Sequence, residues 1–360
     1  MAQKVLFAVH DWGLGHAARS LVLIRALIAR GDEVTILMEP SAGMRLLESE
    51  LGGDCAFYPT RDIPKPFSRW PAVFYLRMSA SMPWVWVHFK LEHRLTERLV
   101  RKRGFDLVVS DSRFGIWSRD VPSYCIFHSL RQIIPGRSRR VEQMVEWGQR
   151  RLLKGFARVL VPDVNENGGL SGDLGHDPAL DWGDGRLVWI GPLADVVRPG
   201  LPEDIDYFFS VSGIEPQRGL LERRVLAALP ELAGRRMVVT LGDPDRAGER
   251  REFAGATVYG YLERERQAEM LNRSRVVITR SGYTTLMELA TLGKRALFVP
   301  TPGQSEQEYL ARFHCELGHV FSTTQRRLDI PRDLVHAEAA AGLPRLSSAE
   351  SVGRFLEVLG

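Results

Sequence analysis

Two residues in the first third of the chain have the types and positions that general-base chemistry requires. His16 ends the loop Asp11-Trp12-Gly13-Leu14-Gly15-His16, which follows an apolar run at 4–10 and opens a helical stretch. Because the positive end of a helix disfavours an imidazolium, we expect a neutral imidazole that can accept a proton. Asp111 follows the buried run at 106–110, and its carboxylate would fix the tautomer of His16. The plainer interpretations are a solvated or capping histidine and a carboxylate that caps a turn.

The same loop also fits a dinucleotide-binding pattern. Gly13-Leu14-Gly15-His16-Ala17-Ala18 satisfies G-x-G-x-x-A, and Glu39 ends the next strand-like run. Gly13 and Gly15 allow a tight turn with close backbone approach, and a helix N-terminus attracts phosphate. On this interpretation the protein is a dinucleotide-dependent enzyme that binds NAD, although so short a pattern is weak evidence alone.

Polar turns suited to phosphate recur in the second half of the chain. Ser212 and Gly213 follow the run at 207–211 and offer a hydroxyl and accessible amides, while Arg218 is a fork-shaped donor for phosphate oxygens. The alternative is a plain strand-to-helix turn. A richer turn follows the run at 275–279, and it consists of Arg280, Ser281, Gly282, Tyr283, Thr284 and Thr285.

Further ligand-binding side chains follow this second turn. Glu288 falls one turn into the next helical stretch, where its carboxylate can accept two ribose hydroxyls. The alternative is an acidic residue that the helix dipole favours. Gln304 and Gln307 lie at the start of the next helix and are expected to reach the same ligand. The segment 279–309 therefore predicts a site for a diphosphate and its ribose.

Strand-like apolar runs alternate with helical stretches, which predicts parallel sheets covered on both faces. The strands predicted first are Lys4–His10, Glu33–Met38, Asp54–Tyr58, Asp106–Ser110, Ser123–Phe127, Arg158–Val161 and Leu187–Ile190. A second series comprises Tyr207–Val211, Met237–Thr240, Ala256–Tyr259, Arg275–Thr279 and Arg295–Val299. The predicted helices are His16–Arg30, Leu91–Arg103, Val141–Lys154, Arg218–Leu229, Arg264–Leu271, Thr284–Leu292, Glu306–Leu317 and Ser347–Leu359.

The two series indicate two doubly wound α/β halves. The proline- and glycine-rich segment 191–202 interrupts the alternation and is interpreted as a linker. We therefore expect an N-terminal domain over residues 1–195, a C-terminal domain over 196–345 and a closing helix over 346–360. Ligands of such folds bind at the carboxyl ends of the strands, which are expected to face a central cleft.

Composition excludes several classes of protein. The chain has 360 residues, of which 44% are hydrophobic and 26% charged, so it is neither disordered nor fibrous. Its net charge of +4 is too small to indicate nucleic-acid binding. Three dispersed cysteines give neither a disulfide framework nor metal-ligand spacing. We expect a cytoplasmic protein without a targeting segment, a membrane span, a metal or a cofactor.

The second-half motifs resemble those of a known family. The run TRSGYTTLMELATLGKRALFVPTPGQSEQEYLA is similar to the nucleotide-sugar motif of GT-B glycosyltransferases of family 28, the MurG-like enzymes. The matching positions are Arg280-Ser281-Gly282, Thr285, Glu288, Gly293, Pro300, Gln307 and Tyr309. Upstream, Gly260-Tyr261-Leu262 resembles the loop that contacts the uracil edge. The resemblance is strong over residues 255–312 and architectural elsewhere.

This resemblance implies a GT-B fold with two Rossmann-like domains and a UDP-sugar donor. Glu288 would then bind ribose, the turn at 281–285 would hold the diphosphate, and Gln307 would help to hold the donor. Gly13, Gly15 and Arg19 would lie in the acceptor-side loop, with His16 as base and Asp111 orienting it. The implied reaction inverts the anomeric carbon and needs no metal.

The chain also departs from the family pattern. Its first loop lacks the G-G-T-G-G-H of the lipid II-forming enzyme, and Lys294-Arg295 follow Gly293 where the family has G-x-P. A stretch from Ser212 to Arg218 replaces the second glycine-rich loop. These departures leave the sugar and the acceptor open, and they argue against the lipid II enzyme itself.

Two other functions remain as alternatives. The loop that ends at Arg19 reads Gly-Leu-Gly-His-Ala-Ala-Arg and resembles the G-x-G-H-x-x-R loop of nucleotide-sugar hydrolases. In those enzymes water replaces the acceptor. A hydrolase or epimerase on the same fold is therefore one alternative. The plainer interpretation of Arg19 is an exposed first-turn cation. A protein that binds nucleotides without turnover is the other alternative.

An aromatic stretch at 70–89 precedes a basic helix, and further arginines cluster at 137–151. Apolar surface flanked by cations favours a peripheral contact at the inner face of the membrane or a groove for a lipid-linked acceptor glycan. The alternative is core packing beside solvated helix faces.

Overall fold

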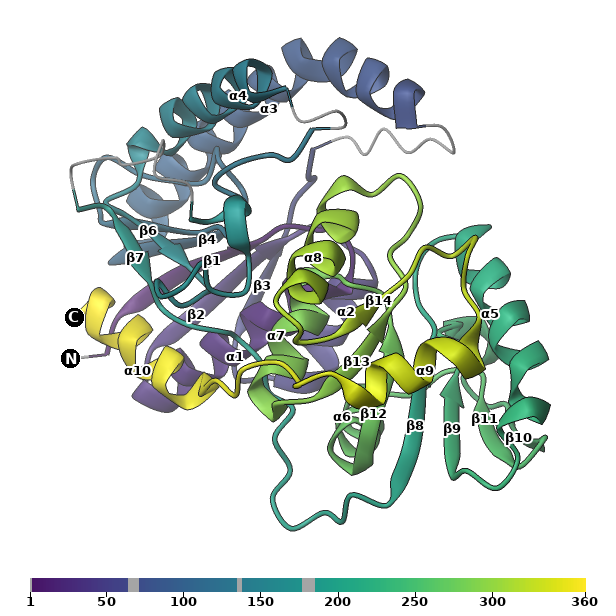
Figure 1. Ribbon diagram of the computed structural model, residues 1–360. Coiled ribbons are helices and arrows are strands. Elements are labelled where there is room, and N and C mark those ends of the chain that lie inside the picture. Colours follow the sequence, from purple (N-terminus) through teal and green to yellow (C-terminus); the bar gives the residue numbers. More distant parts are fainter. Residues whose placement is uncertain (1, 64–70, 135–137, 177–184) are drawn as a thin grey trace. The chain divides into compact units, whose positions relative to one another are not determined.

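The computed structural model describes residues 2–63, 71–134, 138–176 and 185–360, which form two compact units. Unit 1 comprises Met1–Ala194 together with Ser347–Gly360, and unit 2 comprises Asp195–Leu346. Each unit is built around one sheet (Figure 1). The α/β class predicted from the alternating pattern is confirmed.

The sheet of unit 1 has the strand order β3-β2-β1-β4-β5-β6-β7, and its paired strands are parallel. The strands are β1 (Lys4–Val9), β2 (Glu33–Met38), β3 (Ala56–Pro59), β4 (Leu107–Asp111), β5 (Ser123–Ile126), β6 (Arg158–Val161) and β7 (Leu187–Trp189). The direction of winding reverses between β1 and β4, where Val9 lies opposite Asp111. Ligand sites of doubly wound sheets lie at such reversal points.

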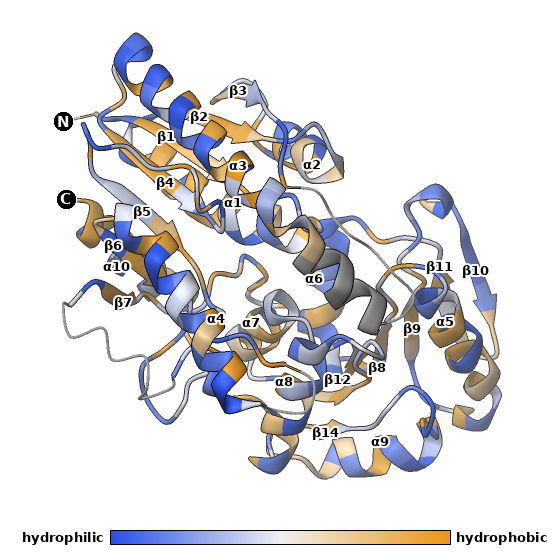
Figure 2. Ribbon diagram, turned by 90° about the horizontal axis from the view of Figure 1, so that it is seen from above, coloured by the Kyte–Doolittle hydropathy of each residue, from blue (hydrophilic) through white to orange (hydrophobic). Residues whose placement is uncertain are grey.

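Helices of unit 1 connect these strands. They are α1 (Leu14–Arg30), α2 (Ala42–Leu51), α3 (Pro71–Arg103), α4 (Arg139–Leu152) and α10 (Ser348–Leu359). The last of them returns from the end of the chain and packs against α1 (Figure 1). Strand β1 is buried from Val5 to Val9, and Figure 2 shows β1, β2 and β4 in hydrophobic colours. These buried strands form the support for the segments at their carboxyl ends.

The sheet of unit 2 has the order β10-β11-β9-β8-β12-β13-β14. Its strands are β8 (Ile205–Ser210), β9 (Met237–Thr240), β10 (Arg250–Phe253), β11 (Ala256–Tyr259), β12 (Ser274–Thr279), β13 (Arg295–Phe298) and β14 (Phe321–Ser322). Its helices are α5 (Gln217–Ala228), α6 (Arg264–Arg273), α7 (Tyr283–Leu292), α8 (Ser305–Glu316) and α9 (Ile330–Ala339). Here the winding reverses between β8 and β12, where Ser210 lies opposite Thr279.

Some elements differ from the prediction. Helix α3 begins at Pro71 rather than Leu91 and continues through Pro83, although a proline inside a helix removes one backbone hydrogen bond. Strand β10 went unpredicted because its four residues are exposed and carry no alternating apolar pattern. Helix α2 also went unpredicted, although Ser41 caps it by accepting from Gly43 and Met44.

The described residues include no helix that is both long and apolar enough to cross a membrane. Trp70, where the predicted aromatic stretch begins, lies outside the described residues.

Candidate functional site

The loop between β1 and α1 places His16 beside the carboxyl end of β4. Gly13 precedes α1 with a φ of 89°, a conformation that favours glycine. Gly13 is exposed and Gly15 is half-buried. His16 Nδ1 lies 3.1 Å from Asp111 Oδ1, so the structure brings the two predicted residues together. Asp111 is fully buried, whereas the His16 side chain keeps 17% of its surface exposed.

Arg19 is the main partner of Asp111. Its Nε donates to Asp111 Oδ2 at 2.8 Å and its Nη2 donates to Asp111 Oδ1, which makes a bidentate pair. Ser20 Oγ also donates to Asp111 Oδ2, at 2.9 Å. With 2% of its surface exposed, Arg19 is not a first-turn surface cation. That interpretation was wrong because Arg19 reaches a carboxylate 92 residues away in sequence.

The surroundings of His16 keep its imidazole neutral. Burial of the ring, followed by the positive charge of Arg19, lowers the pKa of His16 to about 4, although Asp111 opposes this shift. Burial alone would raise the pKa of Asp111, but the charge of Arg19 and the hydrogen bonds from Arg19 and His16 hold it well below its usual range. Above pH 5 the site therefore contains a carboxylate, a guanidinium and a neutral imidazole.

A second histidine–aspartate pair supports the same loop. His10 Nδ1 lies 2.7 Å from Asp62 Oδ2, which also accepts from the Asp11 backbone at 2.7 Å. The His10 and His16 rings meet edge to face with centroids 5.1 Å apart. Sequence reasoning missed this pair, because Asp62 lies 52 residues from His10 in a segment without regular structure. The only local signal was a histidine at the end of an apolar strand.

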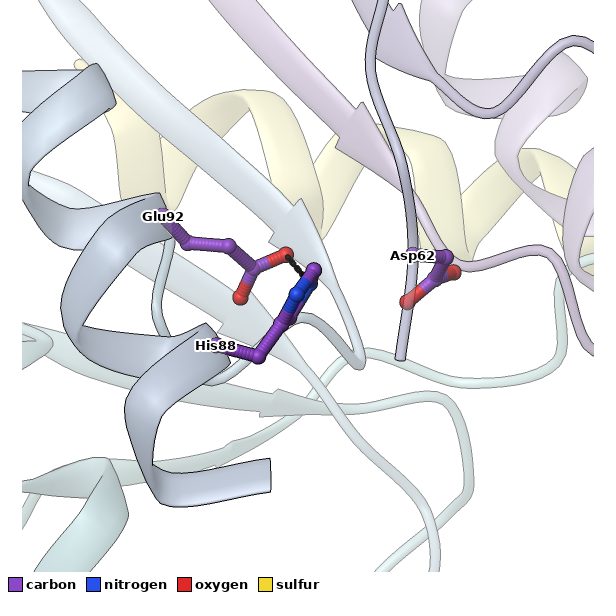
Figure 3. Close-up of side chains that lie close together, drawn as sticks. All are labelled: Asp62, His88 and Glu92. Carbon is purple, nitrogen blue, oxygen red and sulfur yellow. Dashed lines mark ion pairs between the residues drawn. The ribbon is translucent and has the colours of Figure 1, made fainter. Parts of the chain in front are cut away.

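Asp62 also belongs to a cluster with the half-buried His88 and the buried Glu92 (Figure 3). One ligand atom from each lies within 4.8 Å of the others. Glu92 Oε1, however, accepts from Arg113 Nε at 2.9 Å and from Arg113 Nη2 at 2.6 Å. A cation at this cluster would meet the buried guanidinium of Arg113. The expectation of no metal stays a prediction.

In unit 2 the predicted turns follow β8 and β12, on either side of the reversal point. Ser212 is half-buried and Gly213 exposed, with a φ of 112° at Gly213. The neighbouring Gly242 has a φ of 63°, and a Cβ there would lie 2.2 Å from the Val211 carbonyl oxygen. Glycine at 242 therefore permits the close approach of the two loops.

Arg280 organises these loops from within. Its guanidinium donates to the carbonyl oxygens of Val299 at 2.8 Å and Gln217 at 2.9 Å, and to Gln325 Oε1 at 2.6 Å. The side chain is buried, with weaker contacts to the Ser212 and Pro300 carbonyls. Arg280 was predicted to bind the nucleotide, but its donors are used inside the fold. This role was hidden from sequence because its acceptors are backbone carbonyls.

Ser281 and Gln307 connect the N-termini of α7 and α8. The buried Ser281 hydroxyl donates to the Gln307 carbonyl at 2.7 Å. The Gln307 side chain accepts from the Thr301 backbone at 2.9 Å through Oε1. Gly282, Thr284 and Thr285 are half-buried, and Gln304 is exposed. Neither helix has a side-chain cap at its N-terminus, which favours an anion there, although Glu306 and Glu308 in the first turn of α8 oppose one at that helix.

Glu288 lies one turn into α7, half-buried. Burial raises the pKa of Glu288 to about 7, with the charge of Arg264 opposing the shift. Among the described residues, no side chain or backbone amide donates a hydrogen bond to this carboxylate. A half-buried carboxylate that accepts no hydrogen bond from the described residues is suited to accept hydrogen bonds from the hydroxyls of a ligand.

Arg218 differs from the prediction. Its guanidinium lies within ion-pair distance of Glu215 at 2.6 Å, Asp243 at 2.9 Å and Glu222 at 3.4 Å. Arg246 also pairs with Glu222, at 3.0 Å. Arg218 is therefore part of an ion-pair cluster that disfavours its use for phosphate, and its assignment as a phosphate donor stays a prediction.

The remaining predicted positions lie nearby in unit 2. Tyr261 is half-buried, which raises the pKa of its hydroxyl, and Leu262 is buried. The departure after Gly293 also has a structural reason. Arg295, which stands at the position of the family's proline, donates from Nε to the Ala340 carbonyl at 3.0 Å. A proline could not make this contact.

Comparison with known proteins agrees with this architecture. Residues 220–340 match the glycosyltransferase family 28 C-terminal domain. An uncharacterized glycosyltransferase of Methanopyrus kandleri is 27% identical over 227 residues, which cover 58% of this chain and 61% of that protein. The chain thus aligns with about three fifths of the length of this relative.

Solved structures share the fold at low identity. The glycotransferase of kitacinnamycin has a TM-score of 0.66 and 17% identity, and the alignment covers 99% of this chain and 95% of that protein. MurG of Acinetobacter baumannii has a TM-score of 0.60 and 14% identity, covering 98% of this chain and 94% of its own. The calicheamicin glycosyltransferase CalG4 gives a TM-score of 0.62 at 16% identity, over 98% of this chain and 92% of its own.

Proposed function

We propose that this chain, which carries a glycosyltransferase family 28 C-terminal domain on the GT-B fold, is an inverting glycosyltransferase. It would move a sugar from a UDP-sugar to an acceptor hydroxyl. The observation that carries the proposal is the buried His16–Asp111–Arg19 cluster at the reversal point of unit 1. A neutral imidazole beside a carboxylate is suited to take a proton from an alcohol.

The donor would bind to unit 2. Glu288 would accept two ribose hydroxyls, and this fits its half-buried carboxylate. The N-termini of α7 and α8 would hold the diphosphate, and their partial positive charge would stabilise the leaving group. Tyr261 and Leu262 would contact the base, and the choice of uridine follows from the family resemblance alone.

The acceptor hydroxyl would lose its proton to His16 Nε2. The oxygen then attacks the anomeric carbon from the side opposite the departing diphosphate, and that geometry inverts the configuration. The proton stays on His16 and the bond electrons leave with UDP. Asp111 would stabilise the imidazolium that forms, and general-base help of this kind is worth about 10²- to 10⁴-fold in rate.

Nucleotide binding tests the donor half of the proposal. Isothermal titration would compare UDP, dTDP, GDP and NAD on the wild type and on Glu288→Ala. Glu231→Ala, at an exposed glutamate of unit 2, is the matched control. We expect UDP binding that Glu288→Ala weakens and Glu231→Ala leaves unchanged. NAD binding without response to any nucleoside diphosphate would overturn the proposal in favour of the G-x-G-x-x-A interpretation.

The variant His16→Ala tests the assignment of His16 as the base for the acceptor hydroxyl. We expect loss of transfer with UDP binding intact, because His16 belongs to unit 1 and the nucleotide would bind unit 2. Transfer that survives this change would show that His16 is not the base.

We further propose that unit 1 contacts an anionic membrane surface, where a lipid-linked acceptor would be found. Helix α4 has an inverted polarity: Glu142 and Glu146 are buried, while 66% of Met144 and 65% of Trp147 are exposed. Glu146 pairs with the buried Arg131, which anchors this acidic face inward. The apolar face of α4 is therefore left to solvent.

Helix α3 supports the same proposal. Trp84, Val87 and Leu91 are 71%, 47% and 55% exposed and follow helical spacing on one face. The exposed cations Arg94, Arg98 and Lys102 continue that face and line a groove with Arg101 and Arg119. Exposed apolar side chains followed by cations suit the interface of an anionic bilayer.

Vesicle flotation tests this contact. We expect binding to phosphatidylglycerol vesicles, less to phosphatidylcholine, and a fall in binding for Trp147→Ser and for Arg98→Glu. Arg250→Glu, an exposed arginine of unit 2, is the control. Equal recovery with both lipids, or no effect of the first two changes, would contradict the proposal.

A further inference from the structure

We propose that Arg280, a buried arginine without a carboxylate partner among the described residues, attracts the diphosphate of the donor through its charge and without touching it. The proposal rests on the proposed function, because that diphosphate belongs to the UDP-sugar. It assigns the attraction to a guanidinium whose N–H groups all donate within the fold.

Arg280 differs from the other buried arginines in what it contacts. Among the described residues, four arginines have 3% or less of their surface exposed, namely Arg19, Arg113, Arg131 and Arg280. The first three each pair with a carboxylate. The acceptors of Arg280 are backbone carbonyls and the side-chain amide of Gln325. Because buried charges in proteins are as a rule paired, this guanidinium is suited to an anionic ligand.

The neutral partners of Arg280 stabilise its charge but do not cancel it. Carbonyl groups are dipoles without net charge, so the field beyond them stays positive. Burial alone lowers the pKa of Arg280 to about 10, with no contribution from a neighbouring charge. The guanidinium is therefore charged at neutral pH, and salt screens a buried charge less than an exposed one. Arg218, by contrast, lies within ion-pair distance of three carboxylates.

Arg280 lies where three turns at the carboxyl ends of the unit 2 strands converge. It follows β12 and stands just before α7. In the turn after β8, the Ser212 carbonyl oxygen lies 3.4 Å from Arg280 Nε, and a Cβ on Gly213 would lie 3.9 Å from the same nitrogen. After β13, the Val299 carbonyl accepts from Arg280 Nη1 at 2.8 Å. The partial positive charge of the α7 N-terminus adds to that of the guanidinium.

A substitution at Gln325 tests the proposal while Arg280 stays in place. Gln325 Oε1 accepts from Arg280 Nη2 at 2.6 Å, so Gln325→Glu supplies a carboxylate and keeps this acceptor. The bond from Gln325 Nε2 to Gln217 Oε1, at 3.0 Å, can be replaced if the Gln217 amide turns over and donates. We expect the Tm not to fall, because the new carboxylate pairs with a charge that is already buried.

Isothermal titration with UDP, UMP and uridine then measures the effect of the added charge. In Gln325→Glu we expect UDP affinity to fall about tenfold or more, UMP affinity to fall less, and uridine affinity to stay within about twofold. Gln325→Met is the matched control, since it removes the same hydrogen bonds without adding charge. Thr324→Glu adds a charge at an exposed neighbour. Both controls should keep UDP affinity within about threefold.

Equal losses of UDP and uridine affinity in Gln325→Glu would overturn the proposal, and so would an equal loss of UDP affinity in Gln325→Met. Either result would show that Arg280 acts only through its hydrogen bonds. If Gln325→Glu does not fold, Arg280→Lys and Arg280→Gln replace it. UDP affinity should stay higher in the lysine variant, which keeps the charge, and equal affinity in the two would contradict the proposal.

Pyrophosphate distinguishes this inference from the proposed function, because it carries the anion without the nucleoside. It should raise the Tm of the wild type, and raise that of Gln325→Glu less. A wild type that responds to pyrophosphate but binds no uridine nucleotide would overturn the UDP-sugar donor and support the charge of Arg280. A wild type that binds UDP no better than Gln325→Glu does would overturn this inference alone.

Discussion

The hydroxyl of Ser281 donates to the backbone carbonyl of Gln307 at 2.7 Å, and this bond joins the N-terminus of α7 to that of α8. Two uncapped helix N-termini are thereby held close together in unit 2. Because helix N-termini favour an anion, the relationship of these two residues supports the proposed diphosphate site.

Ser281→Ala should weaken nucleotide binding although the hydroxyl need not touch the ligand. Loss of one buried hydrogen bond costs about 1 kcal/mol, and the helix ends should move apart. We expect UDP affinity to fall up to about tenfold, measured by isothermal titration. Thr323→Ala, in the same unit, is a control; an equal loss in that variant would contradict a specific role for Ser281.

The buried pair of Arg19 and Asp111 should dominate the stability of unit 1. Removing one partner leaves an uncompensated charge, so Arg19→Gln or Asp111→Asn should each cost about 3–5 kcal/mol in the free energy of unfolding. The double variant should cost clearly less than the sum, because no lone charge remains. Urea unfolding measures all three. Strict additivity would show that the two charges do not stabilise each other.

Glu288 should make donor binding depend on pH. The ionised carboxylate accepts hydroxyls, and the raised pKa of about 7 means that below this pH a proton must be lost before the ligand binds. Affinity should therefore rise with pH, by up to about tenfold per unit below pH 7, and level off above it. UDP-glucose is the suitable probe, because its diphosphate has no terminal phosphate that titrates in this range.

Glu288→Gln provides the control for that titration. Glutamine offers an acceptor oxygen but does not ionise, so its affinity should be lower at pH 8 and nearly constant from pH 5.5 to 8. A slope that persists in this variant would assign the titration to another group.

Arg280 and Arg218 should respond in opposite ways to removal. Arg280→Ala leaves several buried carbonyls without a donor. At about 1–3 kcal/mol each, their desolvation should unfold or loosen unit 2.

Arg218→Ala should leave UDP affinity within about twofold, since its guanidinium is held by carboxylates rather than presented to phosphate. Thermal unfolding and titration distinguish the two results; a large affinity loss in Arg218→Ala would restore it as a phosphate ligand.

Much of the framework could be predicted from local sequence. Buried parallel strands are continuous apolar runs, so β1, β4, β8 and β12 were found within one or two residues. The loop that holds His16 and the turn that holds Ser281 follow such runs directly. The order of the apolar runs along the chain was sufficient to predict these two positions, because strand ends in a parallel sheet lie on a common edge.

Only the tertiary structure decided what the charged side chains contact. Arg19, Arg218 and Arg280 are all arginines near helix starts, yet one pairs with a buried aspartate, one with a group of carboxylates and one with carbonyls. The sequence by itself determined where these residues stand along the chain. Their partners lie up to 109 residues away, and a charge takes its role from whichever groups the fold brings within about 4 Å of it.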